Sequence, residues 1–141
     1  MAMDAGSKKR LQNAHPLLQK LFNEVAKGTN IQVLDSMRGE AAQMLAYRSG
    51  RSKAKFGQSA HNYSPAIALD VVPLPLDWKN WKAFDALSKV VLAKAKELKI
   101  PVRWGGDWNM NGVKDERFLD GPHYELHPWR KWAKESKLYR G

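Results

Sequence analysis

The stretch SAHNYSPAIALDVVP, residues 59–73, decides both the fold and the chemistry of this chain. It starts as a polar turn and ends in the apolar run AIALDVV, which is typical of a buried strand. Alternation along that strand places Asp70 on the face opposite Leu69 and Val71. The neighbours of Asp70 on its own face are alanines, which leave open space where a core would be filled. His61 and Asp70 are therefore either a loop histidine and a paired carboxylate or two ligands of a metal site.

Composition predicts one compact domain over residues 1–141. The chain has 141 residues, 43% of them hydrophobic, and includes six Trp, four Tyr and four Phe, which supply enough apolar area for a core. It contains no cysteine, so disulfides and thiolate metal sites are excluded. Any zinc ion would need histidine, aspartate or glutamate ligands.

The formal net charge of +10 favours polyanionic partners, either nucleic acid or an anionic cell envelope. The sequence carries no recognised nucleic-acid motif, so no specific nucleic-acid partner is expected. No apolar run approaches the ~20 residues that a transmembrane helix needs. The N-terminus lacks the apolar region of a classical signal peptide, so release from the cytoplasm would need another route.

Hydrophobic periodicity predicts an α+β fold, a small and mainly antiparallel sheet with flanking helices. A first helix is expected over residues 8–27, with regular helix starting only at Pro16 as the alternative. Asp77 is the predicted N-cap of a long helix. The other expected elements are strands at 31–37, 66–72, 100–104 and 123–127 and helices at 39–50, 78–99 and 129–139, the last basic and amphipathic.

A catalytic zinc site can be assembled from His61, Asp70 and His123, because such sites take three protein ligands and leave one position open. Asp120 lies three residues before His123, across a Gly-Pro turn. It could accept a proton from a water activated by the metal and pass it to the leaving amine. Each of these residues also has an ordinary structural interpretation, as a loop histidine, a paired carboxylate or a turn cap.

Two further residues of the last strand compete for these roles. Glu125 shares a face with His123 and is either a rival acid/base or a partner that orients a ligand histidine. His127 is a rival ligand, although Pro128 beside it favours a structural role. His15, directly before Pro16, is expected at a helix start.

The aromatic residues around the loop 105–122 have two interpretations. Trp108 and Tyr124 either fill the core or line a substrate groove. The segment DWNMNGVKDE is rich in Asp, Asn and Gly, but it lacks the spacing and the final Glu of a calcium-binding EF-hand. A solvated loop is the expectation there.

SAHNYSPAIALDVVP and DGPHYEL resemble the two signatures of the zinc D-Ala-D-Ala carboxypeptidase and L-alanyl-D-glutamate peptidase family, especially its small phage endolysins. Flanking segments extend the resemblance to about residues 11–127. It implies a fold like that of hedgehog and the D-Ala-D-Ala peptidases, and one Zn²⁺ bound by His61, Asp70 and His123. It also implies Asp120 as general acid/base, Arg38 as the oxyanion-stabilising cation and Ser59 as a residue that orients the site or the substrate.

This sequence departs from the family pattern at two points. Eight residues separate His61 from Asp70, more than many members have, so a longer turn is expected at the rim of the cleft. The acid/base position holds Asp120, whereas many relatives have Glu, and this keeps Glu125 open as a rival.

The function implied by the resemblance is that of a zinc-dependent phage endolysin. It would hydrolyse an amide bond in the stem peptide of peptidoglycan, with the L-alanyl-D-glutamate bond as the first candidate. Such cleavage would lyse the host cell and make the protein an antimicrobial. The protein is expected to be a monomer without a separate cell-wall-binding domain. A holin-type pore is expected to release it from the host cytoplasm to the periplasm. The alternatives are a D-Ala-D-Ala carboxypeptidase and a non-catalytic basic module that binds the envelope or nucleic acid.

Overall fold

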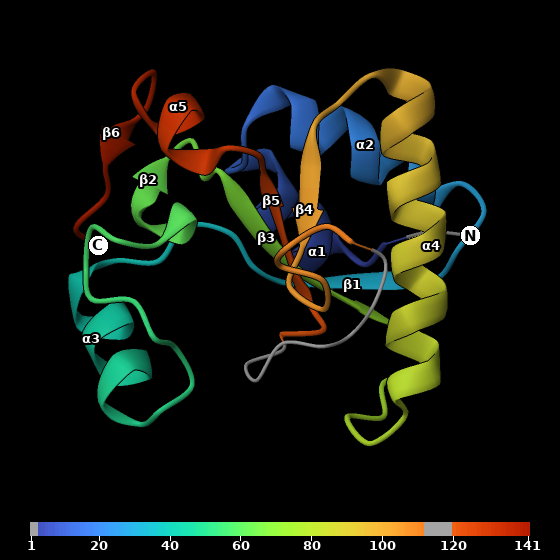
Figure 1. Ribbon diagram of the computed structural model, residues 1–141, viewed down its shortest axis with the longest axis horizontal. Coiled ribbons are helices and arrows are strands. Elements are labelled where there is room, and N and C mark those ends of the chain that lie inside the picture. The colour runs from blue at the N-terminus through green and yellow to red at the C-terminus, as the bar shows by residue number, and fades with distance from the viewer. Residues whose placement is uncertain (1–2, 112–119) are drawn as a thin grey trace.

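The computed structural model describes residues 3–111 and 120–141 of the chain. Figure 1 shows a small central sheet with helices around it. In chain order the elements are α1 (Ala5–Gln12), α2 (Pro16–Ala26), β1 (Ile31–Asp35), α3 (Glu40–Arg48), the 3₁₀ turn η1 (Ala60–Asn62), β2 (Tyr63–Ser64), β3 (Ala68–Pro73), α4 (Trp81–Leu98), β4 (Val102–Trp104), β5 (His123–Leu126), α5 (Trp129–Ala133) and β6 (Lys137–Leu138).

The main sheet has the strand order β1-β3-β5-β4, and every neighbouring pair is antiparallel. The predicted α+β fold with a small antiparallel sheet is therefore confirmed. Asp70 of β3 lies opposite His123 of β5, and Leu69 lies opposite Tyr124. Because directly opposed residues share a face, this register separates a polar face from an apolar one.

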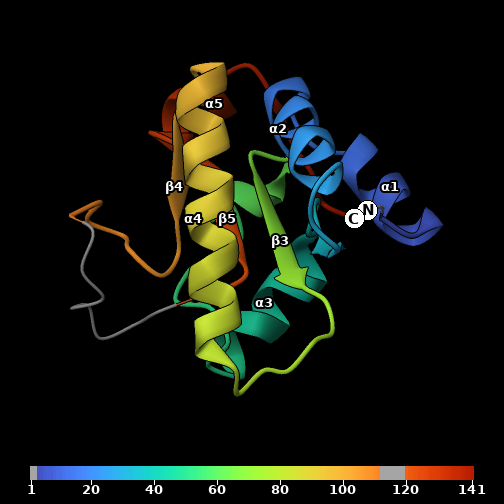
Figure 2. The ribbon, with the colours of Figure 1, turned by 90° about the vertical axis from the view of Figure 1, so that its right-hand side faces the viewer.

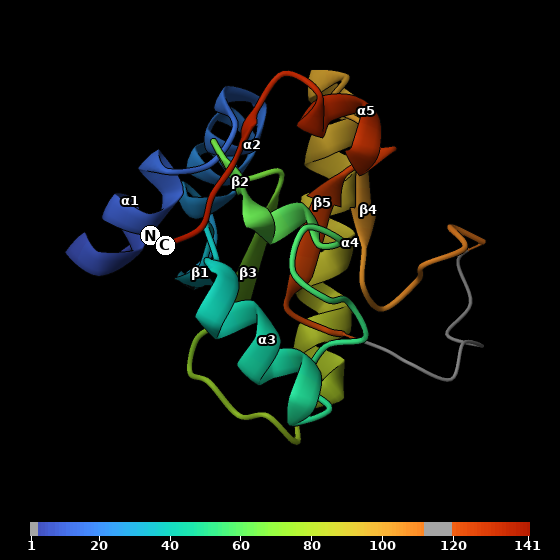
Figure 3. The same ribbon diagram turned by 90° about the vertical axis from the view of Figure 1, so that its left-hand side faces the viewer.

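The apolar face of the sheet is covered by α2 and α4, which pack against each other (Figure 2). Leu69 and Tyr124 are fully buried in the core on this side, and Phe22 of α2 packs edge-on against the Tyr124 ring. The polar face of the sheet points the other way, where α3 lies in front of the sheet while α4 lies behind it (Figure 3). The functional residues can therefore be polar without disturbing the core.

The N-terminal helical region is broken into α1 and α2, so the single helix over residues 8–27 is wrong and the start at Pro16 is right. Pro16 occupies the first turn of α2, where its missing N–H is not needed. His15 is the N-cap, because its Nδ1 accepts a hydrogen bond from the Leu17 N–H at 3.1 Å. The expectation for His15 is thus met.

The long helix α4 starts three residues later than expected, because Asn80 rather than Asp77 caps it. The Asn80 side chain accepts from the Ala83 N–H at 3.2 Å. Asp77 accepts from the Lys79 N–H at 3.0 Å and closes a separate turn. Both residue types cap helices well, and local sequence does not choose between them.

The C-terminal helix is shorter than the expected 129–139, because the chain after α5 pairs with another part of the molecule. β6 forms a two-stranded antiparallel sheet with β2. Ser136 Oγ donates to the Pro65 carbonyl at 3.0 Å, and Tyr139 N–H donates to the Asn62 carbonyl at 2.7 Å. A partner distant in sequence thus overrides the local helical pattern. None of the described helices is both long and apolar enough to cross a bilayer.

Candidate metal centre

His61, Asp70 and His123 come together on the polar face of the sheet, as the sequence predicted. Each offers one ligand atom, and the three atoms lie within 4.8 Å of one another. Asp70 and His123 meet because β3 and β5 pair with these residues opposed. His61 arrives on η1, and both histidines are almost completely buried. These three side chains could together hold a metal ion. Which ion fits depends on the chemistry of the two imidazoles and the carboxylate.

The ring of His61 is oriented by a backbone carbonyl. Its Nδ1 lies 2.8 Å from the Ser36 carbonyl, which accepts the proton of the Nδ1–H tautomer. Nε2 then faces Asp70 Oδ1 at 3.2 Å and carries the free lone pair. Ser59 caps η1, its hydroxyl accepting from the His61 N–H at 3.2 Å, so the turn itself is fixed.

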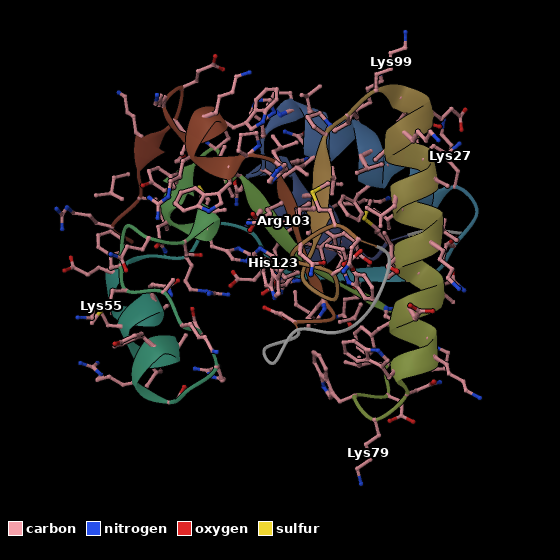
Figure 4. The ribbon with its side chains drawn as sticks, in the orientation of Figure 1. Lys27, Lys55, Lys79, Lys99, Arg103 and His123 are labelled. Carbon is pink, nitrogen blue, oxygen red and sulfur yellow. The ribbon has the colours of Figure 1, made fainter. Side chains whose placement is uncertain are left out.

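The ring of His123 is oriented by a carboxylate. Its Nε2 lies 2.7 Å from Glu125 Oε1, and Nδ1 lies 3.6 Å from Asp70 Oδ1. Arg103 donates to the other oxygen of Glu125 at 2.6 Å. Figure 4 shows Arg103 and His123 near one another in the middle of the molecule. A carboxylate–histidine pair of this kind leaves Nδ1 of His123 as the metal-facing atom.

The electrostatics of the site favour an ionised carboxylate beside the histidines. Burial alone would raise the pKa of Asp70, but His61 and His123 outweigh it and hold this pKa well below its ordinary value. Burial would lower the pKa of His123, but hydrogen bonds to Asp70 and Glu125 raise it to about 10. Two carboxylates thus support a positive charge at this position, whether it is a proton or a metal ion.

Arg38 is fixed next to the triad by several partners. Its guanidinium donates to Asp70 Oδ2 at 3.2 Å and to Asp35 Oδ2 at 3.0 Å. A further donor of the same group reaches Gln43 Oε1 at 3.2 Å. Gln43 is fully buried, and its oxygen also accepts from Asn62 Nδ2 at 3.2 Å. Arg38 lines the cleft, and these partners hold its positive charge in place beside the triad.

Asp120 also lines the cleft beside the triad. Its N–H donates to the Gly105 carbonyl at 2.8 Å, and its carbonyl accepts from the His123 N–H at 3.1 Å. A side chain at position 105 would collide with the Asp120 carbonyl, so glycine is needed for this close approach. Burial raises the pKa of Asp120, more than the charge of His123 lowers it. Such a carboxyl is suited to accept and return a proton.

The triad lies in a cleft of about 1360 Å³ that Ser59 and Trp108 also line. The Trp108 ring lies 5.1 Å from that of His123, measured between centroids. Tyr124 does not line the cleft and is completely buried. The expectation that Tyr124 binds substrate is therefore wrong, because its place in the register turns it toward the core.

The longer turn between His61 and Asp70 leads away from the cleft instead of forming its rim. None of residues 62–69 lines the cleft. The turn includes β2, which pairs with β6, and Ala66, whose carbonyl accepts from the His15 N–H at 2.8 Å. The extra length therefore joins the segment that carries His61 and Asp70 to β6 near the C-terminus and to the start of α2.

The donor set fits zinc better than a hard cation. Two imidazole nitrogens and one carboxylate form the three-ligand pattern of catalytic zinc, and both rings have partners that orient them. Calcium and magnesium prefer oxygen ligands throughout. His127 is not part of the cluster in the described chain. The possible calcium loop spans residues 107–116, and its second half, residues 112–116, lies outside the described residues.

The sequence did not reveal the polar residues that support the site. Ser36, Gln43 and Arg103 act through tertiary contacts to His61, Arg38 and Glu125. Arg103 could have been found by alternation, because it lies opposite Glu125 on the polar face. Gln43 gave no signal, since a buried glutamine in a short helix has no characteristic pattern.

Comparisons with known proteins identify the family of the chain. A family model described as phage L-alanyl-D-glutamate peptidase matches residues 1–127. The L-alanyl-D-glutamate peptidase of Escherichia phage T5 is 29% identical over an alignment of 129 residues, and the match covers 85% of this chain and 93% of that protein. The crystal structure of the Serratia marcescens L-Ala D-Glu endopeptidase ChiX matches with a TM-score of 0.73 at 27% identity and covers 93% of each chain. The resemblance predicted from the motifs is confirmed, and the chain belongs to the family of phage L-alanyl-D-glutamate peptidases.

Proposed function

We propose that this protein is a zinc-dependent endolysin that hydrolyses the L-alanyl-D-glutamate bond of peptidoglycan stem peptides. The observation that carries the proposal is the His61, Asp70 and His123 cluster, buried at the floor of a large cleft. Family membership supports the bond that is cleaved. A single zinc ion per chain is expected, with the protein acting as a monomer.

His61 Nε2, Asp70 Oδ1 and His123 Nδ1 would hold the metal. When bound, zinc supplies Lewis acidity, which brings the pKa of water toward neutrality and polarises a carbonyl. Asp120 takes the proton of the attacking water and later delivers it to the departing D-glutamate nitrogen. Glu125 acts as an orienting group and not as the acid/base, because both of its oxygens are engaged by His123 and Arg103.

Arg38 supplies a fixed positive charge on the side of Asp70. Asp35, Asp70 and Gln43 hold its guanidinium, so little reorganisation is needed when negative charge develops on the substrate carbonyl oxygen. Ser59 acts indirectly, by capping the turn that carries His61. Trp108 packs on His123 and forms part of the wall that a stem peptide would contact.

The decisive experiment treats purified protein with chelator, then adds zinc, and follows the digestion of peptidoglycan by mass spectrometry. We expect loss and recovery of activity, with new amino groups on D-glutamate. Release of single D-alanines instead would favour a D-Ala-D-Ala carboxypeptidase, and activity that ignores the chelator would contradict metal catalysis. His123→Ala should abolish hydrolysis while the circular dichroism spectrum remains native; retained biological activity would favour a non-catalytic envelope-binding module.

We further propose that the protein accumulates in the host cytoplasm and reaches the periplasm through a holin-type pore. The net charge of +10 would then favour contact with anionic envelope components. Expression in a bacterial host should cause lysis only when a holin is co-expressed. Lysis by the protein alone would point to a different route.

A further inference from the structure

Trp78, at one edge of the cleft, takes no part in the chemistry proposed above. It lies between β3 and α4, lines the same cleft as the metal-binding cluster, and is 59% exposed. Single exposed apolar residues are common and need no explanation. Trp78 differs from them because its ring is held in a fixed orientation.

The indole of Trp78 is the outer member of a series of stacked rings. It stacks on Phe84 at a centroid distance of 5.8 Å and an angle of 20°. Phe84 stacks on Trp81, and Trp81 stacks on Trp104, each at 6.1 Å. Trp104 is buried, and its Nε1–H donates to the Gly121 carbonyl at 2.7 Å. The series therefore anchors Trp78 to the core.

Stacking on Phe84 covers part of the indole, and more than half of the side chain stays exposed to a ligand. A rigid aromatic ring binds a flat apolar partner at low cost in conformational entropy. The face of an aromatic ring carries partial negative charge, which suits the C–H groups on the face of a pyranose sugar. The neighbouring Lys79 points away from the molecule (Figure 4).

The other side of the cleft has a different chemical character. Arg51 and Lys53, which follow α3, line it with cationic side chains. Figure 1 shows α3 and the beginning of α4 on opposite sides of the sheet. We call the part of the cleft lined by Trp78, Trp81 and Phe84 its aromatic side, and the part lined by Arg51 and Lys53 its basic side.

The substrate has the same asymmetry. In peptidoglycan the L-alanine is joined through its nitrogen to the lactyl group of N-acetylmuramic acid, so the bond cleaved lies one residue from the glycan strand. The peptide beyond the bond carries carboxylates and no sugar. We propose that Trp78 is a stacking platform for a sugar ring of the glycan strand, which orients the stem-peptide carboxylates toward the basic side. This inference rests on the proposed function, and it assigns the glycan to one side of the cleft and the stem peptide to the other.

The test compares two substrates that share one stem peptide. One is a tetrasaccharide of N-acetylglucosamine and N-acetylmuramic acid that carries the peptide, and the other is the N-acetylated peptide without sugar. We expect Trp78→Ala to lower kcat/KM for the first about tenfold more than for the second. Trp78→Tyr should restore most of the difference, since it keeps an aromatic face. Leu76→Ala, an exposed neighbour in the same loop that does not line the cleft, should not change the ratio.

An equal effect of Trp78→Ala on both substrates, or no effect on either, would overturn the inference. A lower affinity of the variant for phosphatidylglycerol vesicles, with the substrate ratio unchanged, would overturn it in favour of membrane contact. Titration with chitotetraose, followed by the NMR signal of the Trp78 indole N–H, tests the platform without catalysis. A shift of that signal in a protein that cleaves neither substrate would refute the proposed function and retain the sugar site, whereas no shift would refute the site.

Discussion

At the scale of single residues, the site depends on which nitrogen of each histidine is free. His61 donates a hydrogen bond from Nδ1–H to the Ser36 carbonyl and presents Nε2, whereas His123 donates from Nε2–H to the Glu125 carboxylate and presents Nδ1. The two rings lie 5.1 Å apart, close to perpendicular at 70°. Nε2 of His61 and Nδ1 of His123 can both face the same metal position, because a different acceptor binds the other nitrogen of each ring.

Glu125→Gln tests this arrangement at one atom. The amide keeps the shape of the side chain, but it is a weaker acceptor for His123 and loses the ion pair with Arg103. We expect zinc to bind about 10–100-fold more weakly, which is the usual cost of losing such a partner. Competition with a chelator of known affinity measures it. Glu97→Gln, the same change on an exposed side chain of α4, should leave the affinity unaltered; equal losses in both variants would contradict the role of Glu125.

At the scale of elements, the C-terminal segment holds the loop that carries Arg38. The Glu40 N–H donates to the Arg140 carbonyl at 2.9 Å, and the Arg140 side chain pairs with the Glu40 carboxylate at 2.9 Å. A Cβ atom at Gly39 would lie 2.6 Å from the Arg140 carbonyl oxygen. The last residues of the chain therefore pack directly against the segment that leads into α3.

Gly39→Ala should accordingly separate the C-terminal segment from this loop. Because backbone atoms cannot move aside cheaply, we expect a loss of about 1–3 kcal/mol in the free energy of unfolding, measured by urea denaturation. The matched control is Gly28→Ala, where an added Cβ would meet nothing within 4 Å. That variant should be neutral or gain up to about 1 kcal/mol. Identical results for the two alanines would show that the contact is absent in solution.

The N-terminus of α2 gives a prediction about pH. Partial burial lowers the pKa of His15, more than the charge of Glu135 raises it, and Nδ1 must stay unprotonated to cap the helix. A histidine with a lowered pKa in the folded state contributes stability that is present above its unfolded pKa of ~6.5 and is lost as pH falls below it. His15→Asn can cap the helix without titrating. Between pH 7.5 and 5.5 we expect Tm to fall more for the native protein than for the variant; parallel curves would refute this.

At the scale of the whole molecule, the proposed attraction between the positive charge and the anionic cell envelope gives a prediction about salt. The chain carries a net charge of +10, and labelled lysines at different places on the molecule point outward (Figure 4). Exposed charges attract an anionic surface over a distance that salt shortens to about 8 Å at physiological ionic strength. Docking on the cell wall should therefore depend on salt, whereas cleavage of a bound peptide should not.

We expect the rate on isolated, anionic cell-wall sacculi to fall several-fold as NaCl rises from about 0.05 to 0.5 M, since screening removes the long-range attraction. The rate on a short stem peptide serves as the control and should change much less. Parallel losses on both substrates would indicate that salt acts on the active site itself. Measurement of initial rates at low substrate concentration separates these outcomes.

The sequence by itself determined the fold class and the residues of the candidate metal-binding cluster. Alternation is a local property of a strand, and it placed Asp70 opposite the core face before any partner was known. The motif containing His123 then supplied the remaining ligand. Alternation also puts Tyr124 on the face opposite His123, which favours the core over the cleft. Local logic failed at Asp77, where two capping residues compete.

Only the tertiary structure decided what lies behind and beside the ligands. Ser36, Gln43 and Arg103 support the site through contacts between segments far apart in the chain, and no local pattern encodes such contacts. The same holds for β6, whose residues carry a helical pattern but pair with β2. Periodicity reports which side of an element is apolar, whereas the partner on the other side depends on how the whole chain packs.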